Sequence, residues 1–150
     1  MVNHVMKTVA VAGAVVALMG VSTVAGAAPG TGPAIPLNTE QETTGSNTGA
    51  SGFFSYTIDG SQLCYTLTAR NLSVPAGAAH IHVGDRNEAG GIVIPLVVGS
   101  GTTWTHSACP VLTDPAHLAA LEAIEANPRD YYVNVHTPTF PGGEIRGQLK

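Results

Sequence analysis

The sequence predicts an all-β protein, an antiparallel β-sandwich with one short connecting helix at about 114–127. Seven or so short segments alternate apolar and polar residues, which is the period of a half-buried strand. Glycine, proline and Asp-Gly turn signals separate these segments. Only the stretch that begins at Asp114-Pro115 has helical spacing. The apolar faces of the strands would therefore pack against each other and form a core between two sheets.

The first 27 residues are predicted to be an export signal. Lys7 supplies a positive charge, an apolar run extends from Thr8 to about Val24, and Ala25-Gly26-Ala27 fits an A-x-A cleavage site. A membrane anchor is the alternative, since the run approaches the roughly 20 residues that span a bilayer. Small residues dominate the run and the cleavage site follows at once. This pattern favours a cleaved signal, a secreted or cell-envelope location, and no membrane span after cleavage.

The mature chain is predicted to be one acidic domain. Cleavage after Ala27 removes 27 of the 150 residues and leaves 123, with a flexible leader at 28–34 and the folded domain at 35–149. Lys7 is the only charged side chain lost, so five basic residues face ten acidic ones, a net charge of −5. Nucleic acid and anionic lipid require clustered Lys and Arg. This balance therefore argues against both as partners.

Cys64 and Cys109 are predicted to form a disulfide, because an even pair of cysteines in an exported chain is usually oxidised. The two residues are 45 positions apart. Closing a loop of this length stabilises by about 3–4 kcal/mol in the chain-entropy model. The alternative is two buried, reduced thiols, and the spacing does not fit a C-x-x-C redox motif.

The expected strands are 35–37, 52–58, 62–69, 78–83, 92–98, 102–108, 131–137 and 144–149. Proline cannot donate to a ladder, so Pro36 is expected to confine the first strand to a sheet edge. Residues 38–52 are rich in Thr, Ser, Asn and Gly and are expected to form a long loop. Asp59-Gly60 is a strong hairpin signal between the second and third strands.

The helix has recognisable start and stop signals. Asp114 is a good N-cap, and Pro115 at the first helical position loses no needed hydrogen bond. An apolar stripe recurs at helical spacing at Leu118, Leu121 and Ile124. Asn127-Pro128 ends the segment, which leads directly into the strand at 131–137.

His80-x-His82 is the sharpest chemical feature of the sequence. Residues two apart on a strand project to the same side, so both imidazoles can reach one divalent ion. His136 lies on the polar face of its own strand and completes a three-histidine set for copper or zinc if the strands are neighbours. His106 is another candidate third ligand, whereas His117 is expected to face solvent. The alternative is that His80, His82 and His136 are half-exposed residues hydrogen-bonded to Asn, Glu and backbone groups.

A polar face also follows the last two strands. Alternation places Asn134 with His136 on one strand, and Glu144 with Arg146 on the other. Glu144 and Arg146 would form a modest polar cluster, worth about 0.2–1 kcal/mol if exposed. They either contact an anion or a partner, or support the turn at 138–143. We favour the structural role.

Signatures of catalysis are missing from the sequence. It has no G-x-S-x-G elbow, phosphate-binding loop, dinucleotide fingerprint or H-E-x-x-H pattern. We therefore expect a protein that is not an enzyme.

Four stretches together resemble the CHRD domain, a family named for chordin and widespread in microbial exported proteins: Ala79–Gly84, Gly90–Val93, Tyr132–Thr137 and Pro141–Leu149. The resemblance extends over about 35–149. It implies an extracellular sandwich similar to immunoglobulin domains or to copper/zinc superoxide dismutase. It does not imply a settled activity, since function is not carried by fold alone.

The resulting hypothesis is a secreted or cell-surface CHRD protein that acts as a non-catalytic binding or structural module for an extracellular protein or surface ligand. The alternative is a mononuclear copper or zinc protein that uses His80, His82 and His136. The His-x-His strand is similar to that of copper/zinc superoxide dismutase. However, the chain has only six histidines, one of them in the signal, which are too few for a two-metal enzyme site.

Overall fold

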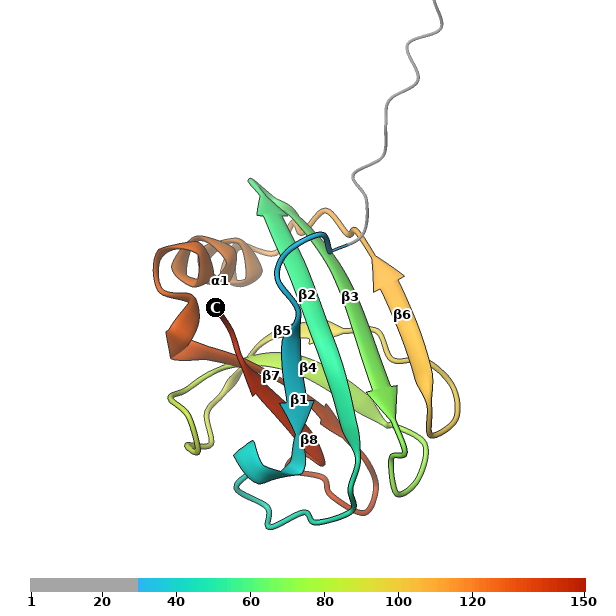
Figure 1. The fold of residues 1–150 in the computed structure, drawn as a ribbon. Coiled ribbons are helices and arrows are strands. Elements are labelled where there is room, and N and C mark those ends of the chain that lie inside the picture. Colours follow the sequence, from blue (N-terminus) through green and yellow to red (C-terminus); the bar gives the residue numbers. More distant parts are fainter. Residues whose placement is uncertain (1–29) are drawn as a thin grey trace, which may run out of the picture.

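A computed structural model describes residues 30–150, so the signal predicted for 1–27 lies outside the described residues. The elements in this part of the chain (Figure 1) are β1 (Ile35–Asn38), η1 (Thr39–Gln41), β2 (Ser51–Asp59), β3 (Gln62–Arg70), β4 (Ala78–Val83), β5 (Ile92–Leu96), β6 (Trp104–Ala108), α1 (Pro115–Ala126), η2 (Pro128–Asp130), β7 (Tyr131–His136) and β8 (Ile145–Gln148). The predicted order of strands and helix is confirmed, with boundaries that differ by a few residues.

The strands form one antiparallel sheet that curls around its own apolar face. Their order is β5-β4-β7-β8-β1-β2-β3-β6. β1 and β8 are paired in register only at Asn38 and Arg146, so the sheet has two halves joined at a narrow seam. Figure 1 shows β2, β3 and β6 lying over β4, β7 and β8. The predicted all-β antiparallel fold with one short helix is confirmed, and its two layers are the halves of a single curled sheet.

The hydrophobic core fills the space between the two halves. Phe54 and Leu67 from one half and Ile81 and Val133 from the other have no exposed surface. Burying an apolar side chain of this size stabilises a fold by about 1.5–3 kcal/mol. The strand faces that carry these residues therefore hold the halves together and leave the opposite faces for polar side chains.

The hairpin of β2 and β3 follows from its local sequence. Its register runs from Ser51 opposite Arg70 to Asp59 opposite Gln62. Gly60 has a φ of +55°, a left-handed conformation that glycine adopts without steric cost. The Asp-Gly signal therefore determined both the place of the turn and the pairing of the strands.

The prediction that Pro36 confines the first strand to a sheet edge is wrong, because β1 lies between β8 and β2. Its ladder runs along β2, while the pair with β8 lies two residues beyond Pro36, at Asn38. Pro36 therefore loses no ladder bond to β8. A Cβ on Gly147 of β8 would lie 2.6 Å from the Pro36 carbonyl oxygen, so only glycine permits this close crossing.

Strand β5 ends at Leu96, before the predicted end of its apolar run at Val98. The Val97 amide donates to the Tyr65 hydroxyl at 3.0 Å, which takes the chain out of the ladder. Apolar character alone could not locate this end, because the tyrosine comes from a distant part of the sequence.

Helix α1 begins and ends as its signals predict. The Asp114 carboxylate accepts hydrogen bonds from the amides of Ala116 and His117, and the helix ends at Ala126. Leu121 and Ile124 are buried, and the helix contacts β5. His117 is partly exposed on α1.

The predicted disulfide between Cys64 and Cys109 is present. Cys64 lies in β3, and Cys109 directly follows β6, the strand at one edge of the sheet. The bond therefore attaches this edge strand covalently to its ladder neighbour β3.

Candidate metal centre

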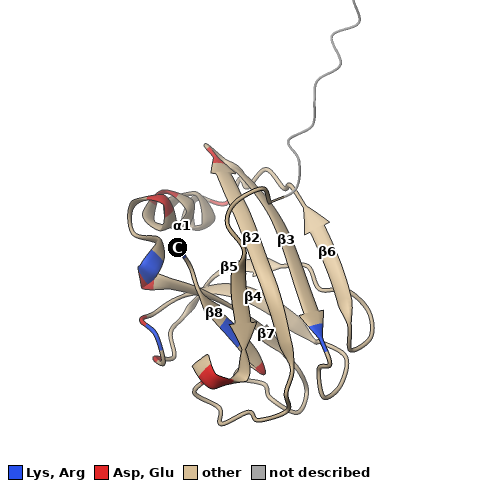
Figure 2. Cartoon of the chain, viewed as in Figure 1, with Lys and Arg blue, Asp and Glu red and all other residues tan. Residues whose placement is uncertain are grey.

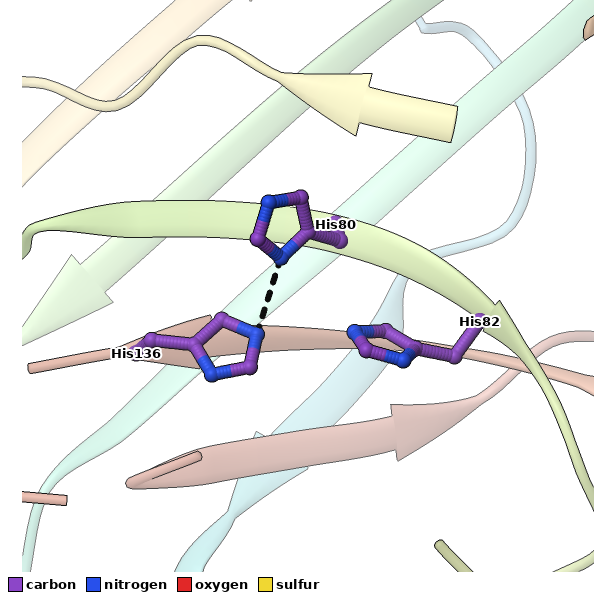
Figure 3. Close-up of side chains that lie close together, drawn as sticks. All are labelled: His80, His82 and His136. Atoms are coloured by element: carbon purple, nitrogen blue, oxygen red, sulfur yellow. Dashed lines mark hydrogen bonds between the residues drawn. The ribbon is translucent and has the colours of Figure 1, made fainter. Parts of the chain in front are cut away.

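The three histidines of the sequence prediction converge on one point. His80 and His82 lie on β4, and His136 lies on β7, the antiparallel neighbour of β4. One ligand nitrogen from each imidazole lies within 4.8 Å of the other two. Figure 3 shows the rings from both strands turned toward one another. His106, the other candidate third ligand, lies on β6 at one edge of the sheet, where its ring is 6.3 Å from that of Tyr65.

Backbone carbonyls determine which nitrogen of two histidines carries the proton. His82 Nδ1 lies 2.9 Å from Gly90 O, and His136 Nδ1 lies 2.9 Å from Pro141 O. A carbonyl oxygen only accepts, so each Nδ1 is the donor and each Nε2 keeps its lone pair in the neutral ring. Carbonyl bonds of this kind orient the histidines of metal sites.

The His80 ring already contacts His136. His80 Nδ1 lies 2.9 Å from His136 Nε2, and it donates because the lone pair of His136 accepts (Figure 3). Within residues 30–150, His82 Nε2 is buried and has no partner at hydrogen-bond distance, although the Asn134 side chain lies close enough to raise the pKa of His82. A change of tautomer at His80 would free its own Nδ1 lone pair without charging any ring. The cluster then offers three neutral nitrogen ligands.

The distances fit a single ion with small adjustments. Ligands that share a tetrahedral zinc at about 2.0–2.1 Å lie about 3.4 Å from one another. The pair at 2.9 Å would open slightly, and pairs as far apart as 4.8 Å would close. Each ring would move by less than about 1 Å, which the side-chain torsions allow without a change of strand register.

Burial keeps all three imidazoles neutral. Desolvation, followed by the nearby His136 and His82, lowers the pKa of His80 to about 4. Desolvation also lowers the pKa of His82 and of His136, against the opposing carbonyl bonds. A metal ligand must present an unprotonated nitrogen. The rings are therefore ready to bind an ion at neutral pH.

Tyr132 and Arg146 support His82 from the side of β7 and β8. The Tyr132 ring stacks on His82 with centroids 4.9 Å apart and an interplanar angle of 11°. The Arg146 guanidinium carbon lies 3.3 Å from the Tyr132 ring centroid. Strand alternation had placed Tyr132 on the face of His136, but only the register of β4 with β7 shows that it lies opposite His82.

Arg146 also holds the loop that orients His82. The side chain is 1% exposed, and its two terminal nitrogens donate to Asp85 O and Glu88 O, each at 2.6 Å. The same loop supplies Gly90 O, the partner of His82 Nδ1. Arg146 therefore connects β8 to the loop whose Gly90 carbonyl orients the His82 ring.

Glu144 has a separate set of partners, in contrast to the exposed cluster with Arg146 that the sequence suggested. Its carboxylate is 0% exposed. The hydroxyls of Thr48, Ser73 and Thr137 and the amide of Ser73 donate to it, each at 2.8 Å. Burial raises the pKa of Glu144, but these hydrogen bonds outweigh burial and lower it overall. Glu144 therefore ties three loops together.

Asn134 is buried behind the histidines, where it faces Glu42. Its amide donates to Gly142 O at 3.3 Å, and it stands opposite His80 in the β4–β7 register. Gly143 has a φ of +126°, and a Cβ there would collide with the Glu42 carboxylate and the Asn134 amide. Burial raises the pKa of Glu42 to about 7, against the opposing charge of Arg146 and the nearby Asn134 amide. Glu42 lies in the segment that the sequence predicted to be a long loop, 38–52.

We expect Glu42→Gln to be more stable than the wild type at about pH 8, with a smaller or reversed difference at about pH 5. A carboxyl group whose pKa is raised in the folded state binds its proton more readily when folded. Its contribution to stability therefore falls as pH rises from 4.5 toward about 7. Urea unfolding at both pH values measures the difference. Glu40→Gln, which changes an exposed residue of η1, is the matched control. An equal pH-dependent difference in both variants would contradict the assignment.

Charged residues are sparse on this fold and are mixed by sign. Figure 2 shows the basic segments separated along the chain, several of them next to acidic ones. Within residues 30–150, no helix has the length and apolar character needed to cross a membrane.

The CHRD domain family matches residues 34–149, which includes every strand of the sheet and all three clustered histidines. The chain belongs to the CHRD domain family. The resemblance seen in the sequence is thereby confirmed over nearly the whole described chain. Comparison with curated proteins gives no match to this CHRD protein, and comparison with solved structures gives none either.

Proposed function

We propose that this CHRD domain is an exported, non-catalytic binding module that holds one copper or zinc ion at His80, His82 and His136. The observation that carries the proposal is the orientation of the rings. Two backbone carbonyls fix the Nε2 lone pairs of His82 and His136 toward a third imidazole. A cluster of histidines serving only as surface polar residues would not require a buried, unpartnered Nε2.

The ligand set selects the class of metal. Three imidazoles without a thiolate suit zinc or copper, whereas magnesium and calcium require oxygen ligands. The alternative of a purely structural polar face uses the same residues. The structural alternative does not account well for His82, which is 6% exposed and whose Nε2, among residues 30–150, has only the nearby Asn134 side chain and no partner at hydrogen-bond distance. Leaving such a group unpaired costs about 1–3 kcal/mol, which a bound ion would offset.

Export is supported by two features of the chain. Residues 1–27 have the pattern of a cleavable signal. The Cys64–Cys109 disulfide is typical of an oxidising compartment. An extracellular module with a buried metal site and no catalytic motif fits both features.

The decisive experiment measures metal stoichiometry. Protein purified without a histidine tag is loaded with Cu(II) or Zn(II), dialysed, and analysed for bound metal per chain. We expect one ion in the wild type, none in His82→Ala and none in His136→Ala. His106→Ala, a half-buried histidine on β6, is the matched control and should keep the ion.

Thermal unfolding provides a second measure of the same site. Ligand present at about 1,000 times its dissociation constant stabilises the folded state by about 4 kcal/mol. Excess metal should therefore raise the midpoint of the wild type and of His106→Ala, but not that of His82→Ala. A wild type that holds no stoichiometric metal, or an equal loss in His106→Ala, would refute the proposed function.

A further inference from the structure

A shallow pocket of about 350 Å³ opens beside the histidine cluster. His80 and His136 line it, whereas His82 is buried behind them and does not. An ion held by the three rings would therefore have its accessible side toward this pocket. The volume lies at the lower end of the range of about 300–1,000 Å³ for small-molecule sites.

The other walls of the pocket are almost wholly apolar. They include Ile92, Ala78, Pro138 and Pro141, and the Ile92 side chain is 57% exposed at the rim. Among the described residues, 30–150, those that line the pocket include no charged side chain. A ligand that enters the pocket would therefore contact carbon on most sides, apart from the two imidazoles.

The polar groups near these walls already have partners. The Thr137 hydroxyl donates to Glu144, and the Thr137 amide donates to Phe140 O. The Gly77 amide donates to His136 O. Pro138 and Pro141 have no backbone N–H to offer. The second oxygen of a metal-bound carboxylate would bring negative charge and have no donor from any of these groups. A neutral azole brings no charge, and its one N–H, on the ring nitrogen away from the metal, faces the open mouth of this shallow pocket.

We propose that the ion at this site keeps one open coordination position, and that this position takes a neutral azole ligand whose apolar body fills the pocket. The proposal rests on the proposed function, because the azole nitrogen binds the ion held by His80, His82 and His136. The azole is either a free small molecule or the imidazole of a histidine in a partner peptide. Both sources present one nitrogen lone pair on a flat, mainly carbon ring.

The test uses full-length exported protein loaded with Cu(II), whose metal content is measured first. Imidazole, 4-methylimidazole and 4-ethylimidazole are titrated, and the change of the copper spectrum gives each dissociation constant. Each added carbon should tighten binding about threefold to fourfold, because burial of one methylene contributes about 0.8 kcal/mol. Imidazole-4-acetate should bind about tenfold more weakly than 4-ethylimidazole.

A matched pair of glycine variants tests whether the pocket is the binding place. A side chain at Gly77, which lines the pocket, or at Gly91, which does not, would meet no atom within 4 Å at its Cβ. Gly77→Leu should keep the ion but abolish the gain from alkyl groups. Gly91→Leu should keep both. A third variant, Ile92→Lys, places a cation at the rim and should narrow the gap between imidazole-4-acetate and 4-ethylimidazole.

The outcomes separate this inference from the proposed function. Protein that holds no metal overturns both. Protein that holds one ion but shows no gain with alkyl length, or an unchanged gain in Gly77→Leu, overturns the inference alone. N-acetylhistidine amide, titrated in parallel, distinguishes the sources: tight binding supports a peptide histidine, and weak binding beside tight alkylimidazole binding supports a free azole.

Discussion

Glu144→Ala is expected to lower the free energy of unfolding by about 2–4 kcal/mol, because it leaves several buried donors without their acceptor. The carboxylate accepts four hydrogen bonds from Thr48, Ser73 and Thr137, which come from three separate loops. Alanine would leave these donors without their acceptor, and the side chain is fully buried. Urea unfolding monitored by tryptophan fluorescence measures the change.

Two control variants show whether the loss of stability in Glu144→Ala comes from its buried hydrogen bonds. Glu122→Ala removes an exposed glutamate from α1 and should change stability by less than about 0.5 kcal/mol. Glu144→Gln keeps the shape but not the charge and should have an intermediate effect. Equal, small effects of Glu144→Ala and Glu122→Ala would show that the network contributes little.

Glu144 is also expected to make the free energy of unfolding depend on pH in acid. The folded-state pKa of Glu144 is lowered from its ordinary value of 4.5. Its stabilisation is therefore complete above the unfolded-state pKa and is lost as pH falls through the folded-state pKa. The stability difference between wild type and Glu144→Gln should shrink below about pH 4. A difference that stays constant across this range would contradict the assigned hydrogen bonds.

Arg146→Met is expected to cost about 2–4 kcal/mol and to weaken metal binding about 10–100-fold. The guanidinium holds Asp85 O and Glu88 O and lies on the ring of Tyr132, which stacks on His82. Without it, the loop that presents Gly90 O to His82 loses its anchor on β8. Arg146 is a positioning residue, so its removal should raise the metal dissociation constant while the three ligands remain.

Hydrogen exchange distinguishes this role from a general loss of stability. Amides of 84–91 should exchange faster in Arg146→Met at conditions where the rest of the sheet stays protected. Arg146→Lys keeps the charge but cannot bond both carbonyls with a planar fork, so it should recover only part of the metal affinity. Arg70→Met is the matched control, because Arg70 also lies near an aromatic ring, that of Phe53, but is exposed on β3. Equal metal affinities of Arg146→Met and Arg70→Met would refute the positioning role.

Local signals account for most of the secondary structure. Alternation gave the strands, Asp59-Gly60 gave the turn of β2 and β3, and Asp114-Pro115 gave the start of α1, because each depends on residues close together in sequence. The edge assignment of β1 failed for a different reason. The sequence shows only that Pro36 lacks a backbone N–H. Whether β8 needs a hydrogen bond from that position depends on how far β1 and β8 are offset along the sheet.

The features of the candidate site also fall into those that local sequence predicts and those that it does not. The sequence by itself determined that His80 and His82 share a face and that His136 shares its own with Tyr132 and Asn134, since side chains alternate along any strand. Only the tertiary structure decided that β4 and β7 are neighbours, that Gly90 and Pro141 orient two of the imidazoles, and that Glu144 and Arg146 are buried apart. Those facts depend on the order and register of strands that are distant in sequence. Packing of the whole core sets that order and register, so no local sequence pattern can predict them.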